Sequence, residues 1–538
     1  MGSNSVRMAT YTGRRHSLAT QSTSSPGLYE KMHDLPLRAP GHLERCLIHQ
    51  NAIGFHSSCQ VTAVYTIDLN ESAEFSRNEL EELVIAALGK TLCCHPILGT
   101  TLRDVDSAWP TWKRLEHVNV RRIVQFIDAD HQSNIEELMQ AEHRRYLTVT
   151  EDLPLWRCLI VTPYMAGCAD SLSFTMSFSW HRAVGDGYSA VYFHQTFLEA
   201  LNLLLSTGGR AGDLNPTANQ KVQVPHLPLV PHLEESMAFP FTPCFLFSKI
   251  LNSLSATLYS PADIVPWSGR PIKDIEEQPP ISYVRAFQLS QEEVTRIVNL
   301  ARHNQATVTA LTTVLTARRL ARLYGPAYTR FIGSVPFSLR KFLRDNRPGD
   351  MGLFTGVAEV SFCSDHSRPQ GYIPCGSSTT LTDKSLAEDE VLWNNVRACK
   401  NVIHRRSESS VNLTNGLMKF VGDFRPHLVK LVGSRRRHAF CVTNLGVVDG
   451  GLASQPKGVS KKAAAFDKLY ASSGNTAISE PYVVGLASVA GGYMTVTLNW
   501  DEGVVDKSDA LALLSGLEQD LKSIATPTTR QSTRSSRL

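Results

Sequence analysis

The feature that most constrains the fold of this chain is a ten-residue alternation of small polar and large apolar side chains at residues 171–180. A period of two residues predicts a β-strand with one apolar face. The small hydroxyl face suits a sheet surface that another group must approach closely. The apolar face carries Leu172, Phe174, Met176, Phe178 and Trp180, and the polar face carries Ser171, Ser173, Thr175, Ser177 and Ser179.

A glycine-bearing turn follows this strand, and a helical pattern begins at Tyr188. The turn reads His-Arg-Ala-Val-Gly-Asp-Gly and contains a titratable pair, His181 and Asp186. Rigid elements on both sides would hold the pair in place, which suits chemistry. Taken alone, His181 is also compatible with a packed, hydrogen-bonded histidine, and Asp186-Gly187 with an ordinary turn.

The turn resembles the active-site segment of the CoA-dependent acyltransferase superfamily. This superfamily includes chloramphenicol acetyltransferase, the condensation domains of peptide synthetases and the fungal alcohol acetyltransferases. Its segment reads His-His-x-x-x-Asp-Gly, in which the second histidine is the general base and the aspartate holds the site together. Aligning Asp186-Gly187 on that motif places His181 on the first histidine and Arg182 on the catalytic one. The resemblance implies that His181, Arg182 and Asp186 occupy the catalytic positions.

Two segments later in the chain, Ser338-Leu-Arg340 and Thr443-Asn-Leu-Gly446, resemble motifs of the same family, so the resemblance spans about residues 35–524. It implies an α/β fold of two chloramphenicol-acetyltransferase-like lobes, each a mixed sheet with helices. A tunnel between the lobes would admit CoA from one face and the acceptor from the other. In this picture Arg340 pairs with Asp186, Thr443 helps to hold the oxyanion, and Gly187 permits close approach.

Arg182 is at odds with a simple transfer of the family's chemistry. A guanidinium stays protonated at physiological pH, so it is not a general base. Three hypotheses remain: His181 has taken over as base, the scaffold performs a non-acyl step such as an isomerisation or cyclisation, or the protein only binds a ligand. We favour an acyltransferase that moves an acyl group from acyl-CoA to a hydroxyl or amine of a small molecule in fungal secondary metabolism.

Acyl-CoA would be a co-substrate, and we expect no tightly bound cofactor and no metal. Its phosphates are highly charged, and basic residues gather late in the chain. Arg435, Arg436 and Lys461 are therefore candidates for holding them, although such runs are also typical of a solvated face.

Composition limits the other possible functions. The net charge is +4, but the first 29 residues and the last 15 each hold three arginines and no acid, so the rest of the chain carries about −2. This distribution argues against nucleic-acid binding, which needs positive charge on the folded surface. The 11 cysteines include no Cys-x-x-Cys, as is typical of reduced thiols inside a cell. No apolar run has the ~18 residues of a membrane span.

We expect a disordered basic tail at 1–27, lobes at 28–205 and 281–525, and a disordered tail at 526–538. Residues 206–280 are dense in proline, which indicates an irregular crossover between the lobes. Residues 450–476 look like a mobile loop. We expect a monomer.

The two ends of the chain suggest different cellular locations. The last residues, Ser536-Arg537-Leu538, are a variant of the Ser-Lys-Leu address, which predicts a peroxisomal protein and an import receptor as partner. A cytoplasmic location is the alternative, and the Arg- and Ser-containing start also resembles a mitochondrial leader without a clear amphipathic stripe.

Overall fold

The structure is a computed structural model. It describes residues 37–68, 76–129, 134–163, 171–207, 221–248, 265–274, 281–325, 327–345, 347–365, 370–376, 386, 389–452, 463–474 and 477–526. All of these belong to one unit, Pro36–Leu538. The tail predicted at 1–27, the candidate Lys461 and the candidate address at 536–538 lie outside the described residues.

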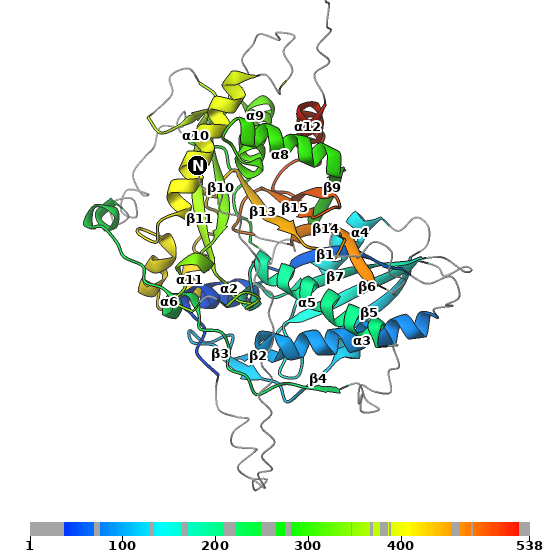
Figure 1. Cartoon of the computed structure of the whole chain (residues 1–538). Coiled ribbons are helices and arrows are strands. Elements are labelled where there is room, and N and C mark those ends of the chain that lie inside the picture. Colours follow the sequence, from blue (N-terminus) through cyan, green and yellow to red (C-terminus); the bar gives the residue numbers. More distant parts are fainter. Residues whose placement is uncertain are drawn as a thin grey trace, which may run out of the picture. The chain divides into compact units, whose positions relative to one another are not determined.

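The first lobe is built on a five-stranded sheet in the order β14-β1-β7-β6-β5. Its strands are β1 (Cys59–Asp68), β5 (Val124–Ala129), β6 (Trp156–Pro163), β7 (Ser171–Trp180) and β14 (Ala464–Ser473). Strand β7 is the alternating segment, and its apolar residues are buried in the core of this lobe. Helices α3 (Arg77–Cys94) and α5 (Gly187–Ser206) contact each other and contribute to the same core. Figure 1 shows both helices beside this sheet.

The hydroxyl face of β7 is also buried near its end, where Ser177 and Ser179 are at most 2% exposed. Strand β1 pairs with β7 so that Gln60 lies opposite Ser179 and Thr62 opposite Ser177. The hydroxyls of Thr62 and Ser177 hydrogen-bond each other at 2.6 Å. Helix α4 (Ile135–Arg144) contacts both β1 of this sheet and β9 of the second sheet. A polar surface is therefore enclosed between the lobes.

The second lobe is built on a seven-stranded sheet in the order β12-β11-β10-β13-β15-β16-β9. Strand β13 runs parallel to both β10 and β15, while β15, β16 and β9 are antiparallel neighbours. Helices α8, α9, α10 and α12 lie near this sheet in Figure 1 and supply much of its core. The strands are β9 (Ser282–Leu289), β10 (Arg330–Ser338), β11 (Thr355–Cys363), β12 (Ile373–Pro374), β13 (Phe440–Val448), β15 (Tyr482–Val489) and β16 (Met494–Asp501). The helices are α8 (Gln291–His303), α9 (Val308–Tyr324), α10 (Glu390–Ser407) and α12 (Lys507–Ala525).

The remaining elements are short and connect or cover the two sheets. Two small ribbons pair β2 (Thr100–Arg103) with β3 (Thr111–Arg114), and β4 (His117–Asn119) with β8 (Lys221–Gln223). The other helices are α2 (His42–Ala52), α6 (Leu233–Ser236), α11 (Phe424–Val429), and the 3₁₀ turns η1 (Pro96–Gly99), η2 (Val120–Arg122), η3 (Arg182–Val184), η6 (Arg340–Phe342) and η8 (Thr414–Phe420). No helix within the described ranges has both the length and the apolar character to cross a membrane.

Strand β14 corrects two predictions. Residues 464–473 are not loop but a strand that pairs antiparallel with β1, from Ile67↔Ala464 to Cys59↔Ser473. The chain after residue 281 therefore contributes a strand to the first lobe's sheet, and the predicted boundary of the second lobe at 281–525 is wrong for this segment. Figure 1 shows the orange β14 next to the blue β1. This strand ties the two lobes together.

Candidate active site

The turn after β7 is held by its own hydrogen bonds. The backbone N–H of His181 donates to the carbonyl of Leu155 at 2.9 Å, and the indole N–H of Trp180 donates to the carbonyl of Gly185 at 2.8 Å. His181 caps the 3₁₀ turn η3, because its Nδ1 accepts from the N–H of Ala183 at 3.1 Å. The strand end, the 3₁₀ turn and helix α5 thus fix the motif from both sides.

Asp186 joins the two lobes. It caps helix α5, accepting from the N–H of Ser189 at 3.0 Å. The same carboxylate accepts from both terminal nitrogens of Arg340, at 2.6 and 3.0 Å, and from the N–H of Phe354 at 3.1 Å. The two charged side chains are buried, with exposed fractions of 7% and 10%. The ion pair implied by the family resemblance is therefore present, and it is a bidentate pair, the strong form of such bonds.

Gly187 lies where helix α5 contacts strand β13 of the second lobe. A Cβ at this position would come within 2.5 Å of the Cδ2 atom of Leu445 on β13. A larger residue here would force the Leu445 side chain to move, so the glycine of the motif has a packing reason of its own.

His181 is a hydrogen-bond donor in this geometry. Its Nδ1 lone pair already accepts the N–H of Ala183, so the neutral ring carries its proton on Nε2. The side chain is buried, with 1% exposed, and burial lowers the pKa of His181 to about 4. Within the part of the chain that the structure describes, Nε2 has no partner. The hypothesis that His181 acts as proton acceptor is not favoured by this arrangement.

Arg182 presents a cation to the same interior. Its Nη1 donates to the sulfur of Cys59 at 3.3 Å, the one hydrogen-bond partner of its guanidinium among the described residues. The Cys59 sulfur first, and then Cys441 and Glu480, raise the pKa of Arg182 above its usual value despite burial. The guanidinium therefore stays charged, and its other N–H groups remain available to a bound molecule.

Two buried histidines that the sequence did not single out belong to this cluster. His56 Nε2 lies 4.0 Å from the sulfur of Cys59. Burial, and then Arg182, His181 and His143, lower the pKa of His56 well below its usual range, which places all four side chains within electrostatic reach of one another. His143 is on α4, between the two sheets. Neither residue lies in a motif, and only the folded chain brings them to Arg182.

Buried polar atoms without a partner are concentrated here. Buried polar groups are nearly always hydrogen-bonded, so this concentration marks an interior in which a bound molecule can supply the partners. Strand pairing makes these residues neighbours, since Gln60 lies opposite both Ser179 and Ser472, and Cys59 opposite Ser473. The atoms are Ser57 Oγ, Ser58 Oγ, Gln60 Nε2, His143 Nδ1, Ser179 Oγ, His181 Nε2, Ser473 Oγ and Asn499 Oδ1.

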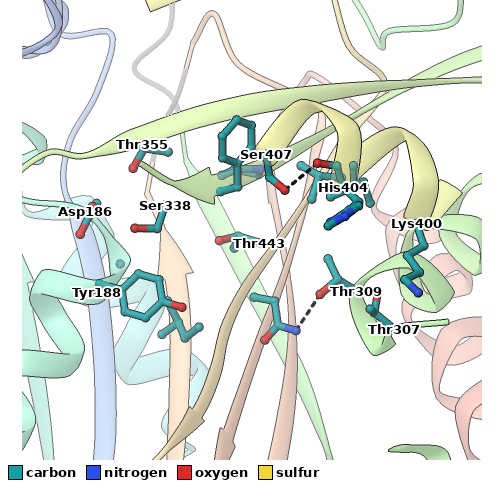
Figure 2. Close-up of a pocket in the computed structure, with 17 residues that line it drawn as sticks. Asp186, Tyr188, Thr307, Thr309, Ser338, Thr355, Lys400, His404, Ser407 and Thr443 are labelled. Carbon is teal, nitrogen blue, oxygen red and sulfur yellow. Dashed lines mark hydrogen bonds between the residues drawn. The ribbon is translucent and has the colours of Figure 1, made fainter. Parts of the chain in front are cut away.

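A cavity of about 360 Å³ opens at the other end of the motif, where α5 begins. Figure 2 shows its polar lining, with Tyr188 from α5, His404 from α10 and Thr443 from β13. Thr443 and Gly187 are thus brought to one cavity, as the resemblance implied. Sequence reasoning missed most of the lining, which comprises Asp186, Gly187, Tyr188, Thr307, Thr309, Val335, Pro336, Phe337, Ser338, Thr355, Lys400, Ile403, His404, Ser407, Thr443, Asn444 and Leu445.

Two of the candidate phosphate residues, Arg435 and Arg436, are among the residues that the structure describes. Arg436 is buried, with 6% exposed, and donates to the backbone carbonyls of Arg270 and Ala477. Burial and these two backbone bonds disfavour Arg436 as a phosphate contact. Arg435 lines a cavity of about 330 Å³ other than the one at α5, together with Arg270, Asp506 and Asp509. Across the described ranges, no group of three or more His, Cys, Asp or Glu side chains is placed to hold a metal.

The chain is similar in sequence to fungal proteins along nearly all of its length. It is 23% identical over 497 residues to the probable alcohol acetyltransferase FCK4 of Fusarium pseudograminearum, covering 91% of this chain and 95% of that one. It is 24% identical over 493 residues to the probable alcohol acetyltransferase crmB of Aspergillus fumigatus, covering 87% and 95%. No protein-family model matches the chain.

Solved structures share its fold. The trichothecene 15-O-acetyltransferase TRI3 of Fusarium sporotrichioides superimposes with a TM-score of 0.69 at 13% identity, covering 94% of this chain and 97% of that one. The first condensation domain of the CDA synthetase superimposes with a TM-score of 0.53 at 13% identity, covering 92% and 97%. The comparisons confirm the resemblance of this chain to the CoA-dependent acyltransferase superfamily and its two-lobe α/β fold.

Proposed function

We propose that this chain is an O-acyltransferase that moves an acyl group from acyl-CoA to a hydroxyl of a small molecule in fungal secondary metabolism. One observation carries the proposal. The turn His181–Gly187 is clamped to the second lobe by the Asp186–Arg340 ion pair and borders a cavity that extends to Thr443. The alcohol acetyltransferase names of the sequence relatives support acyl transfer over the alternatives of isomerisation, cyclisation or ligand binding.

The cavity at α5 suits the pantetheine arm and nearby phosphates of CoA. Its volume of about 360 Å³ is in the range of small-molecule sites. Helix α9 starts at this cavity, and helix N-termini favour anions, whereas the N-terminus of α5 is already capped by the Asp186 carboxylate. The cation Lys400 also lines it; its ammonium donates to the carbonyl of Gln305 and has further N–H donors. Hydroxyls such as Ser338 and Thr443 can bond the amides of the arm. Lys400 thus replaces Arg436 as our candidate for a phosphate contact.

The reaction needs donors for the tetrahedral oxyanion, and the buried cluster holds two. The free N–H groups of Arg182 and the unpartnered Nε2–H of His181 are both suited to this task. A permanent cation at residue 182 then stabilises the negative charge that forms on the thioester oxygen. The position aligned with the family's base would thus serve the oxyanion in this chain.

The test is steady-state kinetics with a panel of acyl-CoAs and alcohols, following thiol release. Lys400→Ala should raise the KM for acyl-CoA about ten- to hundredfold, since an ionic hydrogen bond contributes on the order of 1.5–3 kcal/mol. Arg405→Ala is a matched control, because Arg405 is an exposed cation on the same helix and does not line the cavity. An unchanged KM in Lys400→Ala would contradict the placement of the CoA phosphates in this cavity.

The peroxisomal location stays a prediction. It concerns Ser536-Arg537-Leu538, outside the described residues. Fusion of residues 527–538 to a fluorescent protein tests it: punctate signal that is lost on deletion of Leu538 supports the address, and diffuse signal from both fusions contradicts it.

A further inference from the structure

The proposed reaction needs a proton acceptor, and a hydrogen-bond chain identifies one outside the motif. The hydroxyl of Ser472 lies 3.0 Å from Gln60 Oε1 and 2.8 Å from His143 Nε2. In this orientation of the Gln60 carboxamide its oxygen faces Ser472 and only accepts, so the single hydroxyl proton of Ser472 goes to Gln60. Ser472 must then accept from His143, which places the proton of the neutral imidazole on Nε2 and leaves the lone pair on Nδ1.

That lone pair is buried and unused. His143 is 2% exposed, and its Nδ1 has no partner within the described part of the chain. Burial first, and then Arg157, lower the pKa of His143 to about 3, so the ring is neutral at physiological pH. His143 therefore differs from His181, whose Nδ1 lone pair is taken by a backbone N–H.

A second unpartnered group converges on the same point. A Cβ on Gly474 would lie 2.5 Å from His143 Nδ1 and 2.4 Å from Ser57 Oγ. The Ser57 hydroxyl is also buried and without a partner among the described residues. Both distances are too short for a real contact, so only glycine at residue 474 leaves these two atoms uncovered by a side chain. A substrate hydroxyl that donates to His143 Nδ1 would also lie close to the Ser57 hydroxyl.

Helix α4 holds His143 at the junction of the lobes. Glu136, on the same helix, accepts from the N–H of Ala286 at 2.7 Å and pairs with Arg285 of β9 at 3.3 Å. His143 itself bonds β14, which belongs to the other sheet. Its position is therefore set from both sheets, as a catalytic group requires.

We infer that His143 is the general base of the proposed acyl transfer, with Ser472 and Gln60 as the positioning residues that set its tautomer. This inference rests on the proposed function. The acceptor O–H gives its proton to Nδ1 of His143 as its oxygen bonds the thioester carbon, and the carbonyl electrons move to the oxyanion. When the tetrahedral intermediate collapses, the C–S bond breaks and the CoA thiolate takes the proton back from Nδ1. The products are the ester and free CoA thiol.

The test compares His143→Gln with His95→Gln in the full chain. His95 is a matched control, because it is also a buried histidine of the first lobe, and its Nε2 bonds the hydroxyl of Thr196. His143→Gln should lower kcat by the ~10²–10⁴ expected for loss of a general base, with the KM for acyl-CoA unchanged. His95→Gln should keep kcat near the wild-type value.

Ser472→Ala keeps the base but removes the group that sets its tautomer, so kcat should fall by less than in His143→Gln, again with an unchanged KM for acyl-CoA. If His143→Gln does not fold, Ser472→Ala still tests the inference. Nitrogen-15 NMR of labelled histidine gives an activity-independent readout: wild type should show His143 protonated on Nε2, and Ser472→Ala should lose that preference.

The outcomes separate the two claims. Full activity in His143→Gln, or a wild-type His143 protonated on Nδ1, overturns the inference and leaves the proposed function standing. A wild-type protein with no acyl-CoA turnover overturns the proposed function, and the inference falls with it.

Discussion

At the scale of single residues, our proposal gives the side chain at position 182 a direct part in the chemistry. A guanidinium stands where the resembling family has an imidazole, and its only hydrogen-bond partner among the described residues is the sulfur of Cys59. The sequence could identify this substitution, because it lies within a recognisable motif. It could not identify His143 or Lys400, because they are far along the chain from that motif and no local pattern marks them.

Loss of the Arg182 side chain should weaken the transition state more than substrate binding. Removing an oxyanion donor costs about 10²–10³ in kcat, so Arg182→Ala should lower kcat by this factor with a small change in KM. Arg182→Lys keeps a charge and should retain part of the activity. Steady-state kinetics of both variants checks this. Equal kcat in Arg182→Ala and wild type would exclude a role for this cation in the transition state.

The buried Asp186–Arg340 ion pair should contribute more to the free energy of unfolding than an exposed ion pair does. Asp186→Asn leaves the buried Arg340 cation without its counter-charge, which costs about 3–5 kcal/mol when a buried pair is broken. The matched control is Asp506→Asn, because the ion pair of Asp506 with Arg270 has the same type of contact, at 2.7 Å, but both side chains are more than half exposed. Exposed pairs contribute about 0–1 kcal/mol. Urea unfolding compares the two, and equal losses of stability would contradict the account.

At the scale of elements, local patterns predicted much of the fold. The alternation at 171–180 is strand β7. Ser-x-x-Glu sequences at Ser76 and Ser290, a pattern typical of helix starts, form capping boxes at the beginning of α3 and α8. The glycine turn at Ala490–Gly492 connects the antiparallel strands β15 and β16. These features are encoded by neighbours in sequence, so the sequence is sufficient to predict them.

Strand β14 was not predicted because the contacts that hold it extended come from residues far away in the sequence. Residues 464–473 are rich in alanine and serine, which show no apolar alternation. Their pairing with β1 and the bonds of Thr495 and Thr497 to the β14 carbonyls of Leu469 and Ala471 hold the segment extended. The polar interior of the candidate site depends on this strand, so the sequence could not predict that interior either.

The contact between α5 and β13 predicts a sharp packing effect. In Gly187→Ala the new methyl would meet Leu445 at 2.5 Å, and overpacking of this kind costs about 1–3 kcal/mol. Gly422→Ala is the matched control, because nothing lies within 4 Å of a Cβ there. Thermal melts should show a lower Tm for Gly187→Ala and no comparable loss for Gly422→Ala. The reverse order would contradict the structure.

At the scale of the whole molecule, buried neutral histidines should make folding sensitive to mild acid. Burial lowers the pKa values of His95, His181 and His194 to about 4 and, with Arg157, that of His143 to about 3. The unfolded chain binds these protons near pH 6.5 and the folded chain does not, so the stability they contribute is present above pH 6.5 and lost as pH falls toward 4.

His438 has the opposite sign but does not act in this window. Burial works to lower its pKa, but hydrogen bonds to Glu359 and Glu480 outweigh burial and raise the pKa to about 9. Its contribution is complete below pH 6.5 and is lost only as pH rises through 9. Tm should therefore fall steadily from pH 7 to pH 5. A Tm that is constant over this range would contradict the burial of these neutral histidines.

The central claim is that the two lobes transfer an acyl group from CoA to an alcohol. The most direct measurement incubates the purified full chain with acetyl-CoA and a panel of alcohols, and quantifies ester by mass spectrometry together with free CoA thiol. The account predicts one ester formed for each thiol released, in an amount that depends on the alcohol. Thiol release that is the same without alcohol, or no thiol release across a broad panel of acyl-CoAs and alcohols, would contradict it.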